Sequence, residues 1–190
     1  MLGAVLCGGQ SRRFGSDKAL ADAGGRPLAS WVVEALRQAG ADPVVAVGGT
    51  AGVELGLPTV ADRAPGEGPL AALATVLLWA RSGLVVVAPC DLPLLRAEHV
   101  LLLIEAARQG GPAVAEIDGT PQPSLACWPA SIGPAVQRLV AGGQRSWRAA
   151  LDIGPWIGVV LPPEAMIDAD TPASLAAAIS HRSPPPHEGV

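Results

Sequence analysis

Residues 3–18 read GAVLCGGQSRRFGSDK, and this segment decides the expected fold. Its first five residues, Gly3–Cys7, are apolar and typical of a buried strand. Paired glycines follow directly, so backbone N–H groups can approach an anion without obstruction by side chains. Arg12, Arg13 and Lys18 add positive charge suited to a polyphosphate. The segment therefore predicts a strand that leads into an anion-binding loop.

The spacing of this loop excludes two familiar phosphate-binding motifs. Gly9 and Gly15 enclose five residues, and Lys18 stands three positions further on, whereas a Walker loop needs four residues and an immediate lysine. The dinucleotide-binding pattern G-x-G-x-x-G is also absent from the sequence. A glycine pair alone would leave open an ordinary turn flanked by solvated arginines.

Outward from this segment, short apolar runs alternate with stretches of helical period. Strands are expected at 44–47, 58–60 and 84–88, and helices at about 27–40, from 69 onward and at 97–109. The continuous apolar character of 84–88 is typical of a central parallel strand that is buried on both faces. The alternation predicts an α/β fold with a doubly wound, mostly parallel, Rossmann-like sheet flanked by helices.

After residue 110 the pattern loosens and predicts a mixed extension of the same sheet. Strands are expected at 113–117, 124–128 and 159–161, and helices from about 130, from about 146 and at 172–180, the last with Thr171 as its N-cap. A single domain is expected over 1–182. The proline-rich residues 183–190 are expected to be a disordered tail.

The composition narrows the class of protein. A net charge of −4 argues against a nucleic-acid-binding surface, which is usually basic. The sequence contains no apolar run of the roughly 18 residues that cross a bilayer, and its start lacks a basic leader, so we expect a soluble cytoplasmic protein without a membrane partner.

The three cysteines, Cys7, Cys90 and Cys127, have neither zinc-site spacing nor the look of a disulfide framework, so reduced thiols are expected. If the strands that end at Cys7 and Cys90 are neighbours in the sheet, both thiols would lie close to the ligand, and their oxidation would block the site. Two inert buried thiols are the alternative.

A carboxylate follows the most strand-like run of the chain, in residues 87–93, VAPCDLP. Open α/β sheets bind ligands at the carboxyl ends of their strands, where Asp91 is expected to lie. Mg²⁺ on a nucleotide usually takes one or two protein carboxylates together with phosphate oxygens and water. Asp91 is therefore a candidate metal ligand, with a cap of the following turn as the alternative.

Two further acidic segments are weaker candidates. Residues 168–172, DADTP, offer Asp170 as a second metal ligand, although Asp and Thr here equally suit a helix cap. Residues 62–69, DRAPGEGP, form a polar loop in which Asp62 is a candidate hydrogen-bond acceptor for a base or ribose. A solvated loop is the alternative for that segment.

Taken in this order, the segments resemble the molybdenum cofactor guanylyltransferase family within the wider NTP-transferase superfamily. That family has a loop of the form leucine-alanine-glycine-glycine-x-serine-x-arginine-methionine-glycine followed by aspartate-lysine, which is similar to residues 6–18. Its proline-glycine-x-glycine-proline-leucine and cysteine-aspartate-x-proline segments resemble residues 65–70 and 90–93. Later segments of the family resemble residues 122–126 and 142–146. The likeness covers about residues 3–178 and implies the nucleotide-diphospho-sugar transferase type of fold.

The resemblance implies a Mg²⁺-dependent nucleotidyltransferase in which the terminal phosphate of molybdenum-bound molybdopterin attacks the α-phosphorus of GTP and pyrophosphate leaves. GTP and molybdopterin are the implied partners, and molybdoenzyme maturation proteins are candidate recipients of the product. Asp91, with Asp170 as a second candidate, would hold Mg²⁺, and Lys18 and Arg13 would bind the phosphates. Carried over position by position, the implied GTP-binding residues are Leu6, Cys7, Gly8, Gly9, Lys18, Asp62 and Asp91, and the implied acceptor-binding residues are Gln122, Ser124 and Arg145.

Several alternatives stay open at this point. The chain departs from the family pattern at Cys7, at Phe14 and at Gly48, where some members have an asparagine near the nucleotide. A cytidylyltransferase for the same pterin is the nearest alternative, although Asp17 before Lys18 favours the guanylyl reading. A non-catalytic nucleotide-binding accessory protein and a purely structural α/β domain are the others. Three scattered histidines suggest no general base, and an acceptor phosphate needs none.

Overall fold

The computed structural model describes residues 1–8, 17–61, 68–169, 171, 174–176 and 178. Its centre is one seven-stranded sheet in the order β3-β2-β1-β4-β6-β5-β7. The strands are β1 (Leu2–Leu6), β2 (Val44–Val47), β3 (Thr59–Val60), β4 (Leu84–Pro89), β5 (Ala113–Ile117), β6 (Thr120–Pro129) and β7 (Ile157–Val160).

The first four strands form the parallel half of the sheet. β1 pairs in parallel with β2 on one side and with β4 on the other, and β2 pairs in parallel with β3. Strands that are covered on both faces need apolar side chains at every position, and β2 is buried throughout. The predicted doubly wound, mostly parallel sheet is therefore confirmed.

The second half of the sheet contains one reversed strand. β6 runs antiparallel to both β4 and β5, while β7 pairs in parallel with β5. Asp118 and Gly119 make the β5–β6 turn, both with positive φ. β6 begins at Thr120 rather than at the predicted 124, and β7 begins at Ile157 rather than at 159.

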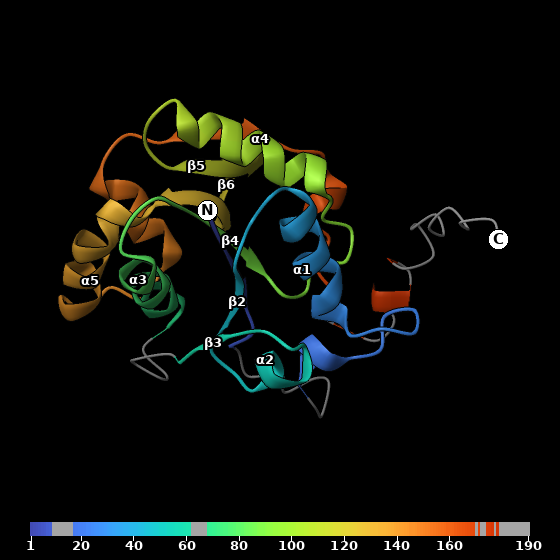
Figure 1. Cartoon of the computed structure of the whole chain (residues 1–190). Helices are drawn as coiled ribbons and strands as arrows, with labels where there is room; N and C mark the ends of the chain where they lie inside the picture. The colour runs from blue at the N-terminus through green and yellow to red at the C-terminus, as the bar shows by residue number, and fades with distance from the viewer. Residues whose placement is uncertain (9–16, 62–67, 170, 172–173, 177, 179–190) are drawn as a thin grey trace.

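Helices cover both faces of the sheet, with α1 and α4 on one face and α3 and α5 on the other (Figure 1). The helix predicted from Ser146 is a 3-10 helix, and the four-residue α2 was not predicted. The α-helices are α1 (Leu28–Gln38), α2 (Ala51–Glu54), α3 (Pro69–Ala80), α4 (Ala97–Arg108) and α5 (Gly133–Ala141), and the 3-10 helices are η1 (Lys18–Leu20), η2 (Ala130–Ile132), η3 (Trp147–Ile153) and η4 (Pro163–Met166).

The described part of the C-terminal region folds back onto the start of α1. Ala169 and Leu175 pack with Ala23 and Leu28 in a small apolar cluster. The hydroxyl of Thr171 accepts a hydrogen bond from the Ser174 backbone N–H at 3.1 Å, which confirms the predicted N-cap. None of the helices in the described residues is long and apolar enough to cross a membrane.

His99 is a buried titratable side chain in the first turn of α4, only 6% exposed. Its Nδ1 accepts a hydrogen bond from the backbone N–H of Arg96 at 3.3 Å, which requires an unprotonated nitrogen. Burial lowers the pKa of His99 below its usual value, against an opposing effect of Glu98. The folded protein therefore holds this histidine neutral.

This arrangement predicts a loss of stability in mild acid. The unfolded chain takes up the His99 proton more readily than the folded chain, so the free energy of unfolding should fall as the pH drops below about 6.5. Each unit by which folding lowers the pKa corresponds to about 1.4 kcal/mol. Urea unfolding between pH 7 and 5 measures the effect, and His99→Asn, which keeps an acceptor oxygen, should flatten the dependence. An equal pH dependence in both proteins would contradict this account.

Candidate functional site

The topology of the sheet marks one edge for ligand binding. The chain leaves β1 towards β2 on one side and later returns to place β4 on the other side, so the strand order reverses between β1 and β4. In open α/β sheets, ligands bind beyond the carboxyl ends of the strands at such a switch point. Leu6 and Pro89, which are partners in the register, end the two strands there.

An ion pair lies at this point. Lys18 Nζ is 2.7 Å from the Asp91 Oδ2 atom, although the two residues are 73 positions apart in the chain. The two side chains are only 13% and 22% exposed. The structure therefore brings together the two residues whose types best suit phosphate and metal binding.

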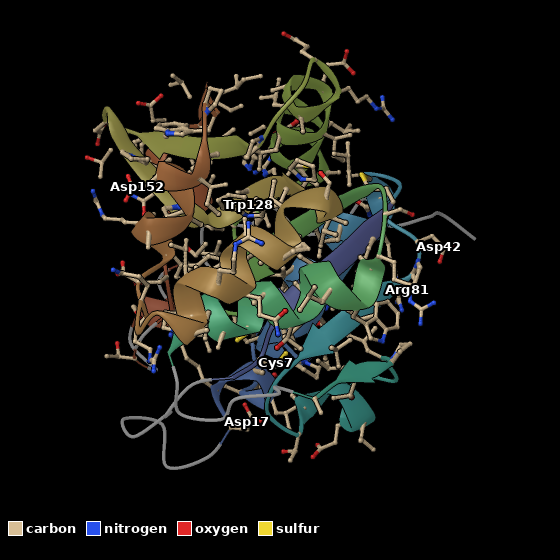
Figure 2. All side chains as sticks on the ribbon, turned by 90° about the vertical axis from the view of Figure 1, so that its left-hand side faces the viewer. Cys7, Asp17, Asp42, Arg81, Trp128 and Asp152 are labelled. Atoms are coloured by element: carbon tan, nitrogen blue, oxygen red, sulfur yellow. The ribbon has the colours of Figure 1, made fainter. Side chains whose placement is uncertain are left out.

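Local structure explains how Lys18 is held. Asp17 caps η1 by accepting a hydrogen bond from the Ala19 backbone N–H at 3.0 Å. Ala19 is fully buried and anchors the short helix in the core. Asp17 lies at the same end of the molecule as Cys7 (Figure 2). Lys18, the first residue of η1, therefore lies next to the ends of β1 and β4.

Backbone segments after β1 and β2 approach each other closely beside this pair. A Cβ atom on Gly48 would lie 3.1 Å from the Gly8 Cα atom, and one on Gly49 would lie 2.6 Å from the carbonyl oxygen of Cys7. Both Gly48 and Gly49 also have positive φ. A side chain at position 49 would therefore clash with the backbone of Cys7, and one at position 48 would be tightly packed against Gly8. Sequence reasoning missed this second glycine pair, although its signal, a glycine pair directly after a strand, matches that of residues 8–9.

Two thiols lie beneath the site. Cys7 and Cys90 directly follow the paired residues Leu6 and Pro89, and the Cys90 backbone N–H donates to the Leu6 carbonyl at 3.2 Å. The strands that end before Cys7 and Cys90 are therefore neighbours in the sheet, as the sequence-based hypothesis about the two thiols requires. A hydrogen-bonding interaction with the Cys7 thiol, together with burial, raises the pKa of Cys90 well above its usual value. Burial raises the pKa of the Cys127 thiol to about 12.

Ala169, in the acidic segment 168–172, contacts the site through its backbone. The Asp91 carbonyl accepts a hydrogen bond from the Ala169 N–H at 3.0 Å. Asp168, directly before it, is exposed. Ala169 is therefore anchored next to Asp91.

The candidate acceptor residues on β6 lie at the same edge of the sheet. The antiparallel β4–β6 register ends at the Val87–Ala126 pair. On the β5 side, Ala126 pairs with Val114 and Gln122 pairs with Ala115, so residues 123–125, which include Ser124, form an irregularity in β6. Because β6 runs opposite to β4, Gln122 and Ser124 lie in its first half, on the side of the carboxyl end of β4.

Arg145 lies at the start of α3. Its carbonyl accepts a hydrogen bond from the Leu70 N–H at 3.2 Å, and a Cβ atom on Gly68 would lie 3.0 Å from the Arg145 Cβ. α3 leads into the parallel strand β4, so the N-terminal end of this helix is at the carboxyl edge of the sheet. The Arg145 guanidinium donates to the carbonyls of Val140 and Gln144.

Four candidates, Gly9, Arg13, Asp62 and Asp170, lie outside the described residues, as does the 183–190 tail, and their predicted roles stay predictions. Among the residues that the structure describes, no three His, Cys, Asp or Glu side chains gather as a metal-binding group. The described part of the site thus offers Asp91 as a single carboxylate beside Lys18. That set leaves room for oxygen ligands from a nucleotide.

Comparison with curated proteins shows relatives across most of the chain. A probable molybdenum cofactor guanylyltransferase of Deinococcus radiodurans is 38% identical over 147 residues, which are 76% of each chain. A molybdenum cofactor guanylyltransferase of Cereibacter sphaeroides is 33% identical over 150 residues, covering 76% of this chain and 77% of the relative.

Solved structures agree with the fold. The molybdopterin-guanine dinucleotide biosynthesis protein A of Archaeoglobus fulgidus matches with a TM-score of 0.75 and 25% identity, covering 95% of this chain and 97% of the other. A 2-C-methyl-D-erythritol 4-phosphate cytidylyltransferase of Thermus thermophilus matches with a TM-score of 0.73 over 93% of this chain and 96% of the other, at 19% identity. This second likeness is one of fold, the nucleotide-diphospho-sugar transferase type.

The family itself follows from the sequence match. Residues 3–154 match the MobA-like NTP transferase domain, and this range runs from β1 through η3. It contains both the glycine-rich segment and the Lys18–Asp91 pair. The chain therefore belongs to the MobA-like NTP transferase family.

Proposed function

We propose that this chain transfers GMP from GTP to molybdenum-bound molybdopterin, with Mg²⁺ as its metal, giving the molybdopterin guanine dinucleotide cofactor and pyrophosphate. The observation that carries the proposal is the Lys18–Asp91 pair at the switch point of the sheet. The names of relatives at 33–38% identity support guanylyl transfer in particular. A cytoplasmic location, expected from the composition and the cysteine usage, and transfer of the product to molybdoenzyme maturation proteins belong to the same proposal.

The donor set suits Mg²⁺. The Asp91 side chain is partly exposed, at 22%, and offers one carboxylate that would hold Mg²⁺, while nucleotide phosphates and water would supply the other oxygen ligands. When bound, Mg²⁺ would neutralise charge that develops on the phosphates. Asp91 would hold the metal, and Asp170 remains a second candidate ligand.

Lys18 would act on the nucleotide by position and charge. Transfer of a nucleotidyl group depends mainly on alignment and on stabilisation of negative charge, with little covalent chemistry by the protein. The cap of η1 holds the Lys18 backbone, and the ion pair with Asp91 holds its ammonium group before the nucleotide arrives. Binding of phosphate and metal would replace the contact between Lys18 and Asp91 with contacts to the ligand.

The acceptor itself provides the nucleophile. Its terminal phosphate is already anionic, so the reaction needs no general base from the protein. His99 agrees with this, because its Nδ1 accepts a backbone hydrogen bond in the buried first turn of α4. Gln122, Ser124 and Arg145 would orient the acceptor from the β6 and α3 sides of the same edge.

Calorimetric titration with GTP, CTP, ATP and UTP, each with and without Mg²⁺, tests the proposal. We expect GTP with Mg²⁺ to bind at least about tenfold more tightly than CTP, a difference of ~1.4 kcal/mol. Formation of the dinucleotide cofactor from molybdenum-bound molybdopterin and GTP is the second measurement. Preference for CTP would identify a cytidylyltransferase with the same mechanism. GTP binding without product in the presence of the acceptor would favour a non-catalytic accessory protein.

A further inference from the structure

Two of the three cysteines face each other at the floor of the candidate site, and the proposed mechanism uses neither thiol. Cys7 and Cys90 occupy the positions just beyond the Leu6–Pro89 pair of two neighbouring parallel strands. Both side chains belong to the same apolar cluster on the face covered by α1 and α4, so they lie on one side of the sheet. A shared face and a shared register position make the two thiols direct neighbours.

The spacing of such positions suits a disulfide. Neighbouring strands lie about 4.7–4.9 Å apart, and disulfides form between Cα atoms about 4.4–6.8 Å apart. The backbone hydrogen bond from Cys90 N–H to the Leu6 carbonyl holds the two strand ends in register at this level. Cys127 lies on the same face but pairs with Val86, four residues before Cys90 on β4, which is out of reach.

The two thiols differ in access. Cys7 is 6% exposed, whereas Cys90 is intermediate in exposure and comes directly before the partly exposed Asp91. Cys90 is therefore the thiol that an oxidant in solution reaches first. Cys7 is the neighbouring thiol that can then bond to Cys90. Cys127 is fully buried in the core and is shielded from the same reagent.

We propose that Cys7 and Cys90 form a reversible disulfide at the floor of the site, and that this bond weakens binding of Mg²⁺ and GTP. The oxidant is a low-molecular-weight disulfide. The Cys90 thiolate attacks one sulfur of that disulfide, forming a mixed disulfide and releasing one thiol. The Cys7 thiolate then attacks the Cys90 sulfur, and the second thiol leaves. The protein loses two protons and two electrons in all, and the oxidant is reduced to two thiols.

The effect on the nucleotide follows from the neighbours of the two cysteines; this part of the inference rests on the proposed function. Cys7 is followed by Gly8, and Cys90 is followed by Asp91. A disulfide holds its Cβ atoms about 3.5–4.5 Å apart at a fixed dihedral angle, so the bond constrains the two strand ends that carry Gly8 and Asp91. Because the constraint acts on the two positions that the proposed function assigns to GTP and Mg²⁺, the oxidised form is expected to bind them more weakly.

The first test maps the disulfide without reference to nucleotide. The full chain is equilibrated in mixtures of reduced and oxidised glutathione, free thiols are blocked, and peptides are identified by mass spectrometry. We expect a Cys7–Cys90 crosslink with loss of two hydrogen atoms, while Cys127 stays free and the change reverses with dithiothreitol. Cys127→Ala should behave as the unaltered chain, and Cys90→Ala should form no crosslink. A bond to Cys127, or glutathione adducts alone, would overturn the proposal.

The second test measures the coupling to the site. If GTP with Mg²⁺ binds the reduced form tenfold more tightly than the oxidised form, saturating nucleotide must raise the midpoint potential of the crosslink by about 30 mV. An unchanged potential, with GTP bound equally by both forms, would refute the coupling and leave the disulfide standing. Reduced protein that binds no GTP would contradict the proposed function and the coupling together, while the crosslink is still scored by mass.

Discussion

Replacing Asp91 with asparagine is expected to lower kcat/KM for GMP transfer by about 100-fold or more, equivalent to ~2.7 kcal/mol of transition-state stabilisation. Asparagine keeps the shape of the side chain but removes the charge that we assign to the metal. The same change releases Lys18 from its 2.7 Å ion pair. GTP binding without Mg²⁺ should therefore persist or tighten, while the benefit of adding Mg²⁺ is lost.

Pyrophosphate release in the presence of molybdopterin and GTP, together with calorimetry, separates these effects. Asp152→Asn is the matched control, because Asp152 is exposed on η3 and lies well away from Cys7 and Asp17 (Figure 2). Unaltered turnover in Asp91→Asn, with Mg²⁺ still improving GTP affinity, would remove Asp91 from the proposed mechanism. Weak GTP binding at every Mg²⁺ concentration would instead indicate a damaged site.

Truncation of Trp128 to alanine is expected to destabilise the fold by about 3–5 kcal/mol. Trp128 is the largest fully buried side chain, on β6 opposite Val85, and packs in the cluster that joins the sheet to α3 and α5. Removal of the ring leaves a cavity at the centre of that layer. Urea unfolding measures the change, and the melting temperature should fall by roughly 10 °C for a chain of this size.

Trp128→Phe separates the packing of the ring from its polar atom. Within the described part of the chain, the Trp128 Nε1 is buried without a hydrogen-bond partner. An unpaired buried donor costs about 1–3 kcal/mol, so phenylalanine offsets its smaller volume by removing that donor. We expect Trp128→Phe to change stability by no more than about 1 kcal/mol. Equal destabilisation by both substitutions would show that the indole group has a partner or a packing role that phenylalanine cannot supply.

The parallel half of the fold was predictable because the apolar sequences of its strands indicate burial on both faces. β2 and β4 are nearly continuous runs of valine and alanine, which suit strands covered on both faces. Pro69 in the first turn of α3 marked the start of that helix correctly. Local pattern and tertiary environment agree in these elements.

The reversed half was less predictable because local signals there oppose the final structure. Pro121 and Pro123 weaken the strand signal, since proline cannot donate to a ladder. The structure tolerates them because β4 pairs only with residues 126–129 of β6, which leaves the first half of β6 paired with β5 alone. The length of β6 is thus set by tertiary pairing. α2 has only four residues, too few to show a helical period, whereas the helix predicted from Ser146 forms as the 3-10 helix η3.

The candidate site was predictable in its residue types and only partly in its contacts. Asp91 could be selected because a carboxylate at the end of a buried strand has few structural uses. Its ion pair with Lys18 depends on the position of η1 relative to β4, which no local pattern encodes. The Gly48–Gly49 pair was missed because its necessity comes from the nearby backbone of residues 7–8.

Because β6 runs antiparallel to its neighbours, the two halves of the ligand-binding edge differ in how well they tolerate inserted residues. Strands β1, β2 and β4 are joined by helices that must cross the sheet, so an insertion there disturbs the alignment of the nucleotide side. The β5–β6 connection is a hairpin that projects past the end of β4, and added residues at Asp118 and Gly119 lengthen only its tip. The β5–β6 hairpin is therefore the part of this edge that can change in length while β1, β2 and β4 keep their alignment.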